Sequence, residues 1–246
     1  MTLFSAYSGF LASLPERLQY ERKDLLVPEL LVESDDRFRI FYSPFDWFNP
    51  SARVIILGIT PGWTQMELAC RAARTAILSG ATPDEVCRSA KLHGSFAGPM
   101  RANLVKMLDG IGLHTALHLE SSADLFKPPR HLLHTASVIR YPVFKGNSNY
   151  TGNGPRLTKS PLLMNIARTV LAPELKSIAN ALIVPLGKSV EELLEVLGRE
   201  GLVRPGRWLS GFPHPSGANG HRVRLFNENR SSLRQQVRAA LQRSAG

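Results

Sequence analysis

The stretch RVIILGITPGW, residues 53–63, carries the clearest structural signal in this chain. Its first half is a run of branched apolar residues that ends at Gly58, which is typical of a buried strand in a parallel sheet. Its second half contains Pro61 and Gly62, and glycine lets the backbone pass close to a ligand. A helix that begins after this loop would direct its first amides at an anion.

Three further apolar runs have the length of strands: ASVIRYPV (136–143), NALIVPLG (180–187) and RWLSGFP (207–213). Helical patterns separate them, and this alternation predicts an α/β fold built on a mostly parallel sheet. Four strands are enough for a small three-layer arrangement. At 246 residues the chain has the length of one large domain, so we expect a single domain, 1–246.

Capping residues predict where several helices begin. Thr82 and Ser189 each start a capping-box pattern with Glu three residues later, and Ser160 precedes a proline at the first helical position. Apolar residues at helical spacing predict a helix over 100–111 and a basic C-terminal helix over 229–244.

The formal net charge is +10, and two segments carry the excess. Residues 125–173 contain seven Lys and Arg but no Asp or Glu, and residues 201–246 contain eight Arg and one Glu. A localised basic excess is expected of a protein that binds nucleic acid, although it also fits a solvated basic face. The polar loop 145–159 combines one aromatic with basic residues, which suits base stacking or a flexible surface excursion.

No apolar run has the length needed to span a bilayer, and the first residues lack the pattern of a secretion signal, so we expect a soluble, cytoplasmic protein. Cys70 and Cys87 are too few for a disulfide framework or a four-thiolate cluster and are expected to be buried thiols. His131 and His134 are expected at the surface. Because no metal-ligand spacing and no nucleotide-binding motif occurs, we predict neither a metal nor a cofactor.

The stretch GFPHPSGANGHR, residues 211–222, predicts a shaped loop, because its prolines and glycines suit neither a helix interior nor a central strand. His214 lies between two prolines, which restrict its backbone and fix the direction of the imidazole. Ser216 can form hydrogen bonds within the turn. A fixed imidazole could donate a hydrogen bond to negative charge on a leaving group, so His214 is the strongest catalytic candidate.

Five segments, taken in order, resemble the motifs of the uracil-DNA glycosylase superfamily. GITPGW (58–63) resembles the first motif and HPSG (214–217) the second. GSFAGPMRANLVKMLDGIGL (94–113) is similar to a segment of the iron–sulfur-type members, and SVIRYPV and ALIVPLGKSVEELL follow in the places of two of their strands. The resemblance covers roughly residues 50–222 and leaves an N-terminal extension, 1–49.

This resemblance implies a three-layer α/β/α fold around a four-stranded parallel sheet, a DNA partner, and hydrolysis of the N-glycosidic bond of a flipped uracil or other damaged base, as in base excision repair. It implies that Phe96 stacks on the base and His214 donates to it as it departs. Ile59 and Thr60 would form the turn over the base, with Thr60 beside the attacking water, and Ser137 would face the base edge.

The resemblance and the charge pattern together indicate a set of residues that contact DNA: Pro61, Gly62, Arg140, Lys145, Arg156, Pro215, Ser216, Gly217, Arg222 and Arg224. Single-stranded or mispaired DNA is the expected substrate, because extruding a base costs least there. We expect a monomer.

Two positions depart from the family pattern. Many members have Asp or Asn where Thr60 stands, and a threonine is no general base at neutral pH. Ser137 lacks the paired donor and acceptor of the asparagine that many members use to read the base. The cluster cysteines of the iron–sulfur-type members are also absent. Two alternatives therefore remain: a nucleic-acid-binding module of this fold without catalysis, and an enzyme acting on free nucleosides or nucleotides, or on RNA.

Overall fold

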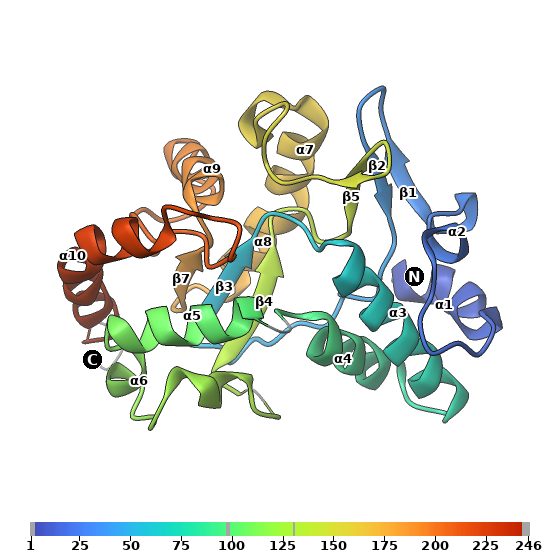
Figure 1. Ribbon diagram of the computed structural model, residues 1–246, viewed down its shortest axis with the longest axis horizontal. Helices are drawn as coiled ribbons and strands as arrows, with labels where there is room; N and C mark the ends of the chain where they lie inside the picture. Colours follow the sequence, from blue (N-terminus) through green and yellow to red (C-terminus); the bar gives the residue numbers. More distant parts are fainter. Residues whose placement is uncertain (1–2, 97–98, 130, 243–246) are drawn as a thin grey trace. The chain divides into compact units, whose positions relative to one another are not determined.

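The structure is a computed structural model that describes residues 3–96, 99–129 and 131–242 (Figure 1). The chain divides into two compact units, each built from three segments. Unit 1 consists of Met1–Phe48, Thr60–Ala97 and Ile139–Thr151, and unit 2 consists of Asn49–Ile59, Gly98–Val138 and Gly152–Gly246. The expectation of a single domain stays a prediction.

Unit 2 is built on a parallel sheet of three strands, with β3 in the middle. The strands are β4 (Leu133–Ser137), β3 (Val54–Gly58) and β7 (Leu182–Pro185). Gly58 pairs with Ser137 on one side, and Leu57 pairs with Pro185 on the other. Every residue of β7 and all but the last of β3 are buried, as expected for strands covered on both faces.

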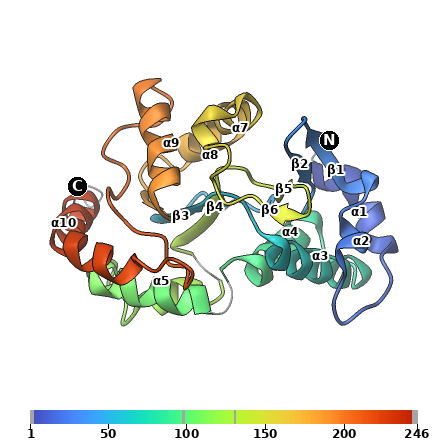
Figure 2. The same ribbon diagram turned by 45° about the horizontal axis from the view of Figure 1, so that its top comes forward.

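Helices cover both faces of this sheet and give unit 2 three layers. Helices α8 and α9 lie on one face, and α5 and α10 lie on the other (Figure 2). Their bounds are α5 (Pro99–Gly110), α8 (Ala172–Ser177), α9 (Lys188–Arg199) and α10 (Arg222–Gln242). The shorter elements of unit 2 are α6 (Leu113–Ala116), η2 (Ser122–Phe126), η3 (Leu157–Lys159), α7 (Pro161–Ile166) and the π-helical turn η4 (Ala167–Leu171).

The expected fourth strand over 207–213 is reduced to a single bridge in the described chain. Trp208 bridges to Ile183 in the parallel sense, where Ile183 N–H donates to Arg207 O (2.8 Å) and Leu209 N–H donates to Ile183 O (2.9 Å). The ladder stops because Gly211 adopts a φ of +83° and two prolines follow. The prediction of four strands is therefore wrong, while the mixed α/β class is confirmed.

Several predicted boundaries also need correction. The second strand ends at Ser137, so the predicted strand 136–143 begins too late and runs through a turn. The C-terminal helix begins at Arg222, not at 229, and its predicted end at 244 lies outside the described residues. Ser189 is not a cap, because α9 begins at Lys188 with Gly187 in the capping position.

Unit 1 contains a second sheet that the sequence analysis did not predict. It is antiparallel, in the order β1-β2-β5-β6. Its strands are β1 (Leu31–Ser34), β2 (Arg39–Phe41), β5 (Val143–Lys145) and β6 (Ser148–Asn149). The last two form a hairpin, so the segment 145–159 is not one long loop. The extension 1–49 supplies β1 and β2 and is thus largely part of a folded unit.

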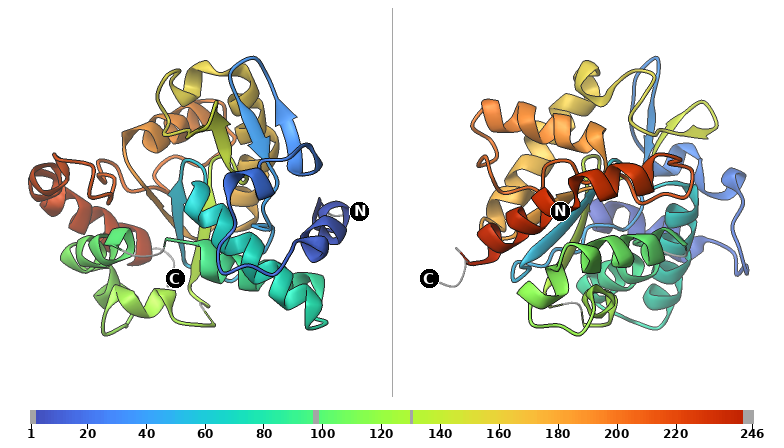
Figure 3. Two further views of the ribbon diagram at one scale, coloured as in Figure 1. Left: turned by 45° about the vertical axis from the view of Figure 1, so that its right-hand side comes forward. Right: turned by 60° about the vertical axis from the view of Figure 1, so that its left-hand side comes forward.

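The helices of unit 1 are visible together in Figure 3. They are α1 (Leu3–Ser13), α2 (Arg22–Leu25), η1 (Pro28–Leu30), α3 (Trp63–Leu78) and α4 (Pro83–Gly94). The capping box predicted at α4 is confirmed: the Glu85 carboxylate accepts the Thr82 N–H at 2.8 Å, and the Thr82 hydroxyl accepts the Glu85 N–H at 3.4 Å. Among the described residues, no helix is both long and apolar enough to cross a membrane.

Candidate functional site

The carboxyl ends of the parallel strands meet at one edge of the unit 2 sheet, where ligands bind in open α/β folds. Ile59 directly follows β3, and Ser137 is the last residue of β4. Gly187 follows β7 closely, and its N–H donates to Phe212 O at 3.2 Å. The structure therefore brings Ile59, Ser137 and the chain that leads to His214 to the same edge.

The His214 loop depends on a close backbone approach at Gly187. Gly187 has a φ of +90°, and a Cβ placed there would lie 3.0 Å from His214 Cβ and 3.5 Å from its backbone nitrogen. Gly187 also caps the N-terminus of α9, so the positive end of a helix lies beside the His214 backbone. A residue with a side chain could not adopt this conformation without moving the loop.

Two side chains brace the loop from outside. The Arg222 guanidinium donates from Nη1 to Ser216 O (2.8 Å) and to Pro215 O (3.2 Å). Asn103, on α5, donates from Nδ2 to Pro215 O at 3.1 Å. Arg222 was predicted to contact DNA, and the structure shows that it also holds the loop in place.

The turn that precedes the loop is clamped by two helices. The Glu191 carboxylate, on α9, accepts the Gly211 N–H at 3.0 and 3.1 Å and also the Ser210 hydroxyl. Asn229, on α10, donates from Nδ2 to Gly211 O at 2.8 Å. Sequence reasoning missed Asn103, Glu191 and Asn229, because they lie far from the loop in the chain and form no motif.

The neutral imidazole of His214 is held in one tautomer. The Ser216 N–H donates to Nδ1 at 3.1 Å, so Nδ1 carries a lone pair and the ring proton of the neutral form sits on Nε2. Burial lowers the pKa of His214 below its usual range. His214 therefore presents a neutral Nε2–H donor, and no partner of Nε2 lies among the described residues.

Pro215, Ser216 and Gly217 shape the tip of this loop. The Ser216 hydroxyl accepts the Ala218 N–H at 3.2 Å, which confirms the expected hydrogen bonding within the turn. Gly217 is exposed, and a Cβ on it would meet nothing within 4 Å. The tip is thus open to solvent and offers backbone rather than bulky side chains.

In unit 1, the Thr60 hydroxyl has three backbone partners, of which Pro61 O, at 3.4 Å, is the most distant. Oγ1 donates to Tyr141 O at 2.8 Å and accepts the Val143 N–H at 3.1 Å. The hydroxyl proton is therefore committed to a carbonyl, and Thr60 joins its loop to the segment that leads into β5. The role beside a water that the resemblance implies for Thr60 stays a prediction.

The first amides of α3 were expected to face an anion, and the structure gives them side-chain partners instead. The Gly62 N–H donates to Gln65 Oε1 at 2.9 Å, and the Trp63 N–H donates to Asn149 Oδ1 at 3.0 Å. A Cβ at Gly62 would lie 3.2 Å from Asn149 Nδ2. Pro61, beside them, is buried. The expected anion site at this helix is therefore already filled by amide oxygens.

Phe96 has an unusual backbone conformation. Its φ is +47°, in the left-handed region that non-glycine residues rarely adopt, and its side chain is only 6% exposed. Backbone strain of this kind is held by its surroundings and is concentrated at functional positions. Phe96 belongs to unit 1, and its role toward a base stays a prediction.

A half-buried carboxylate in unit 1, that of Asp46, was not anticipated. Asp46 accepts the Tyr42 hydroxyl at 2.7 Å and the Tyr141 hydroxyl at 2.5 Å, and Arg140 Nη1 lies 3.6 Å from its Oδ1. Burial, together with the Asp46 charge, raises the pKa of both tyrosines, so they remain neutral donors. Arg140 was predicted to contact DNA, but part of its charge is balanced by Asp46.

The other predicted DNA-contacting cations lie at the surface. Lys145, at the end of β5, and Arg156 are exposed. Arg224 is exposed as well and pairs with Glu228 one turn along α10, with Nη1 and Oε1 2.9 Å apart. These three positions stay predictions.

Both cysteines are buried, as predicted, and burial raises the pKa of each thiol to about 12. The surface position expected for His134 is wrong: it is buried in β4 with Nε2 2.7 Å from Glu174 Oε1. No group of three His, Cys, Asp or Glu side chains suited to a metal gathers within residues 3–96, 99–129 and 131–242.

The described residues define a mixed α/β protein with one parallel and one antiparallel sheet. The chain is 42% identical over 220 residues to the uncharacterized protein YoxB of Bacillus subtilis, and the match spans 89% of this chain and 86% of YoxB. The chain therefore belongs to the same family as YoxB.

Two other comparisons do not identify a family for the chain. No model of a known protein family matches the chain. The crystal structure of wild-type SMUG2 from Pedobacter heparinus aligns with 96% of this chain and 98% of its own, at 12% identity and a TM-score of 0.43. A likeness at that TM-score does not establish a shared fold.

Proposed function

We propose that this protein is a DNA glycosylase of the uracil-DNA glycosylase type, which hydrolyses the N-glycosidic bond of a flipped uracil or other damaged base. The observation that carries the proposal is the state of His214: a neutral imidazole with Nδ1 occupied by the Ser216 N–H and Nε2–H available as a donor. The motif order described above supports it.

The chemistry suits such a donor. When the bond between C1′ and the base nitrogen breaks, both bonding electrons leave with the base, and a water oxygen then bonds to C1′. The proton that this water loses passes through solvent to the base anion, which leaves as the neutral base. A neutral N–H donor stabilises the departing anion without giving up its proton. A rigid loop is needed, because a displaced donor loses most of its effect. The contacts of Arg222, Asn103 and Glu191 supply that rigidity.

The proposed partner is DNA that the protein binds as a monomer. Support comes from the basic segments 125–173 and 201–246 and from the exposed cations Arg156 and Arg224. The open tip at Gly217 would let the backbone approach a phosphate closely. We expect single-stranded and mispaired substrates to be preferred, because extruding their bases costs least.

The test uses end-labelled oligonucleotides with one uracil, hypoxanthine or xanthine, single-stranded and in each pairing, followed by alkali. Wild type should produce cleavage at the lesion, and His214→Ala should reduce the rate by roughly 10²- to 10³-fold, the range for loss of one such donor. His221→Ala is the matched control, because His221 is exposed in the same stretch. Equal rates for His214→Ala and wild type would refute the role of His214.

One observation favours a second candidate, a nucleic-acid-binding module without catalysis. The Thr60 hydroxyl donates to Tyr141 O and accepts the Val143 N–H, so only one lone pair of its oxygen remains for a water, and a neutral hydroxyl is no general base. This candidate predicts salt-sensitive DNA binding, with no product from any lesion in the same assay.

A further inference from the structure

A pocket of about 700 Å³ lies in unit 2, away from the His214 loop. Its lining comes from residues 168–179, which precede β7, and from 201–207, which precede the bridge at Trp208. It is therefore at the amino ends of the strands, whereas His214 follows their carboxyl ends. Its volume is in the range of small-molecule sites.

The pocket contains a buried guanidinium. Arg207 is only 6% exposed and donates to three carbonyl oxygens, those of Leu175 (2.9 Å), Ile178 (2.5 Å) and Ala181 (3.3 Å). Its Nε is also buried and has no partner in the part of the chain that the structure describes. The carbonyls orient the guanidinium but carry no net charge, so its positive charge is not neutralised by them.

Further cations add to the positive charge at this pocket. Burial, and then the like charge of Arg204, lower the pKa of Arg207. Arg204 and Lys176 are exposed at the same pocket. Arg168 also lines the pocket. Its Nη2 and Nε lie 2.7 and 2.9 Å from the Glu200 carboxylate, so the positive charge of Arg168 is neutralised by Glu200.

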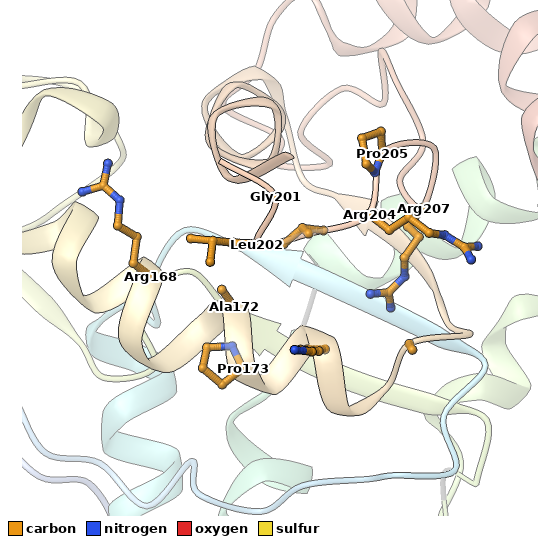
Figure 4. Close-up of a pocket in the computed structure, with 11 residues that line it drawn as sticks. Arg168, Ala172, Pro173, Gly201, Leu202, Arg204, Pro205 and Arg207 are labelled. Carbon is orange, nitrogen blue, oxygen red and sulfur yellow. The ribbon is translucent and has the colours of Figure 1, made fainter. Parts of the chain in front are cut away.

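The pocket has a cationic end and an apolar middle. Arg168 lies at one end and Arg204 and Arg207 at the other, with Leu202, Ala172 and Pro173 between them (Figure 4). Leu202 is 38% exposed and gives the pocket part of its apolar surface. An anion at the cationic end would relieve the repulsion, and an organic group attached to it would cover the apolar middle.

We propose that this pocket binds a phosphate group, with Arg204 and Lys176 as its contacts and Arg207 as a fixed charge behind them. Several cations at one end favour a dianionic phosphate over a single carboxylate. The apolar middle accommodates a ring attached to the phosphate, as in a nucleoside monophosphate. A free nucleotide and the terminal phosphate of a DNA strand share this chemistry, and the experiment separates them.

The experiment is calorimetric titration of the full chain with a deoxynucleoside 5′-monophosphate and with the same nucleoside lacking phosphate. Wild type should bind the monophosphate, and Arg204→Glu should weaken binding by about tenfold or more, as expected for losing a charge-assisted contact. Lys176→Glu should act in the same direction. Arg199→Glu is the matched control, because Arg199 is exposed on α9 outside the pocket, and it should bind like wild type.

A second arm compares one oligonucleotide with and without a 5′-phosphate. If the mononucleotide does not bind, but the phosphorylated strand binds about tenfold more tightly than the other in wild type and not in Arg204→Glu, the phosphate site stands and its source is a DNA end. Equal binding of nucleoside and nucleotide, or unchanged binding of every probe by Arg204→Glu, overturns the proposal. Binding of a mononucleotide requires no base release, so this test and that of the glycosylase activity fail separately.

Discussion

At the scale of single residues, His214 and Thr60 show how backbone groups determine what a polar side chain can do. A backbone N–H occupies Nδ1 of His214 and leaves Nε2–H available. The Thr60 hydroxyl donates its hydrogen bond to a backbone carbonyl, that of Tyr141. The first arrangement prepares a donor for a ligand, and the second uses the donor within the protein.

The protonation of His214 predicts how stability depends on pH. Its folded-state pKa is lowered, whereas the unfolded chain keeps the usual value of about 6.5. Above that value the group does not affect stability, and as the pH falls below it the unfolded state binds the proton first, so the free energy of unfolding decreases. The loss is about 1.4 kcal/mol for each unit by which the pKa is lowered.

Urea unfolding of wild type and His214→Gln between pH 8 and pH 5 measures this contribution. Wild type should lose stability relative to the variant only below about pH 6.5. All other titrating groups are shared, so they cancel in the difference. A difference that grows toward alkaline pH would contradict the lowered pKa.

Thr60→Val should destabilise the protein by about 1–3 kcal/mol, because it leaves the Val143 N–H and the Tyr141 carbonyl without their partner. Thr60→Ser keeps the hydroxyl and is the matched control. It should lose clearly less stability than Thr60→Val. Chemical denaturation measures both. If the two variants were equally stable, the hydroxyl bonds would contribute nothing.

At the scale of elements, the end of β7 and the start of α9 determine the course of the His214 loop. Gly187→Ala should place a methyl group 3.0 Å from His214 Cβ at a φ of +90°. Positive φ alone costs an alanine about 1–2 kcal/mol, and the contact adds to it. We therefore expect Gly187→Ala to lower the free energy of unfolding by more than the cost of the positive φ alone, and to reduce the rate of base release strongly.

Gly80→Ala is the control for this prediction, because Gly80 has a φ of +79° with nothing within 4 Å of a Cβ. Thermal unfolding and the oligonucleotide assay should show a smaller destabilisation and unchanged activity for Gly80→Ala. If the two substitutions destabilised the protein equally, the positive φ of Gly187 would account for the whole effect and the contact with His214 would contribute nothing.

Elements with strong local signals could be predicted from the sequence. The buried run at Val54–Gly58 and the capping box of α4 both lie where their patterns place them. The strand Leu133–Ser137 was misplaced because its polar residues His134 and Thr135 are buried, which hides the apolar pattern. The antiparallel sheet was missed because its strands are short and its central pairing, of β2 with β5, joins segments that are distant in the chain.

The candidate site follows the same rule. The position and shape of the His214 loop could be predicted, because prolines and glycines act locally. The clamps from Asn103, Glu191 and Asn229 could not, because they depend on which helices pack beside the loop.

At the scale of the whole molecule, the excess of basic charge predicts how DNA binding depends on salt. The logarithm of the affinity should fall linearly with the logarithm of salt concentration, since phosphate contacts release counterions. Arg156→Ala should reduce the slope by about one and weaken binding to all sequences alike. Arg199→Ala is the control, and fluorescence anisotropy at several salt concentrations measures both. A slope near zero for wild type would exclude binding through phosphates.

The antiparallel sheet also has a consequence for how the chain folds as it is synthesised. Ile40 pairs with Val143, so β2 leaves the ribosome long before its partner exists. At roughly 5–20 residues per second, β2 spends on the order of 5–20 s with one edge open. Open strand edges are prone to pair with other chains. The nascent N-terminal segment is therefore exposed to aggregation until β5 is made, and a chaperone would be expected to protect it during that time.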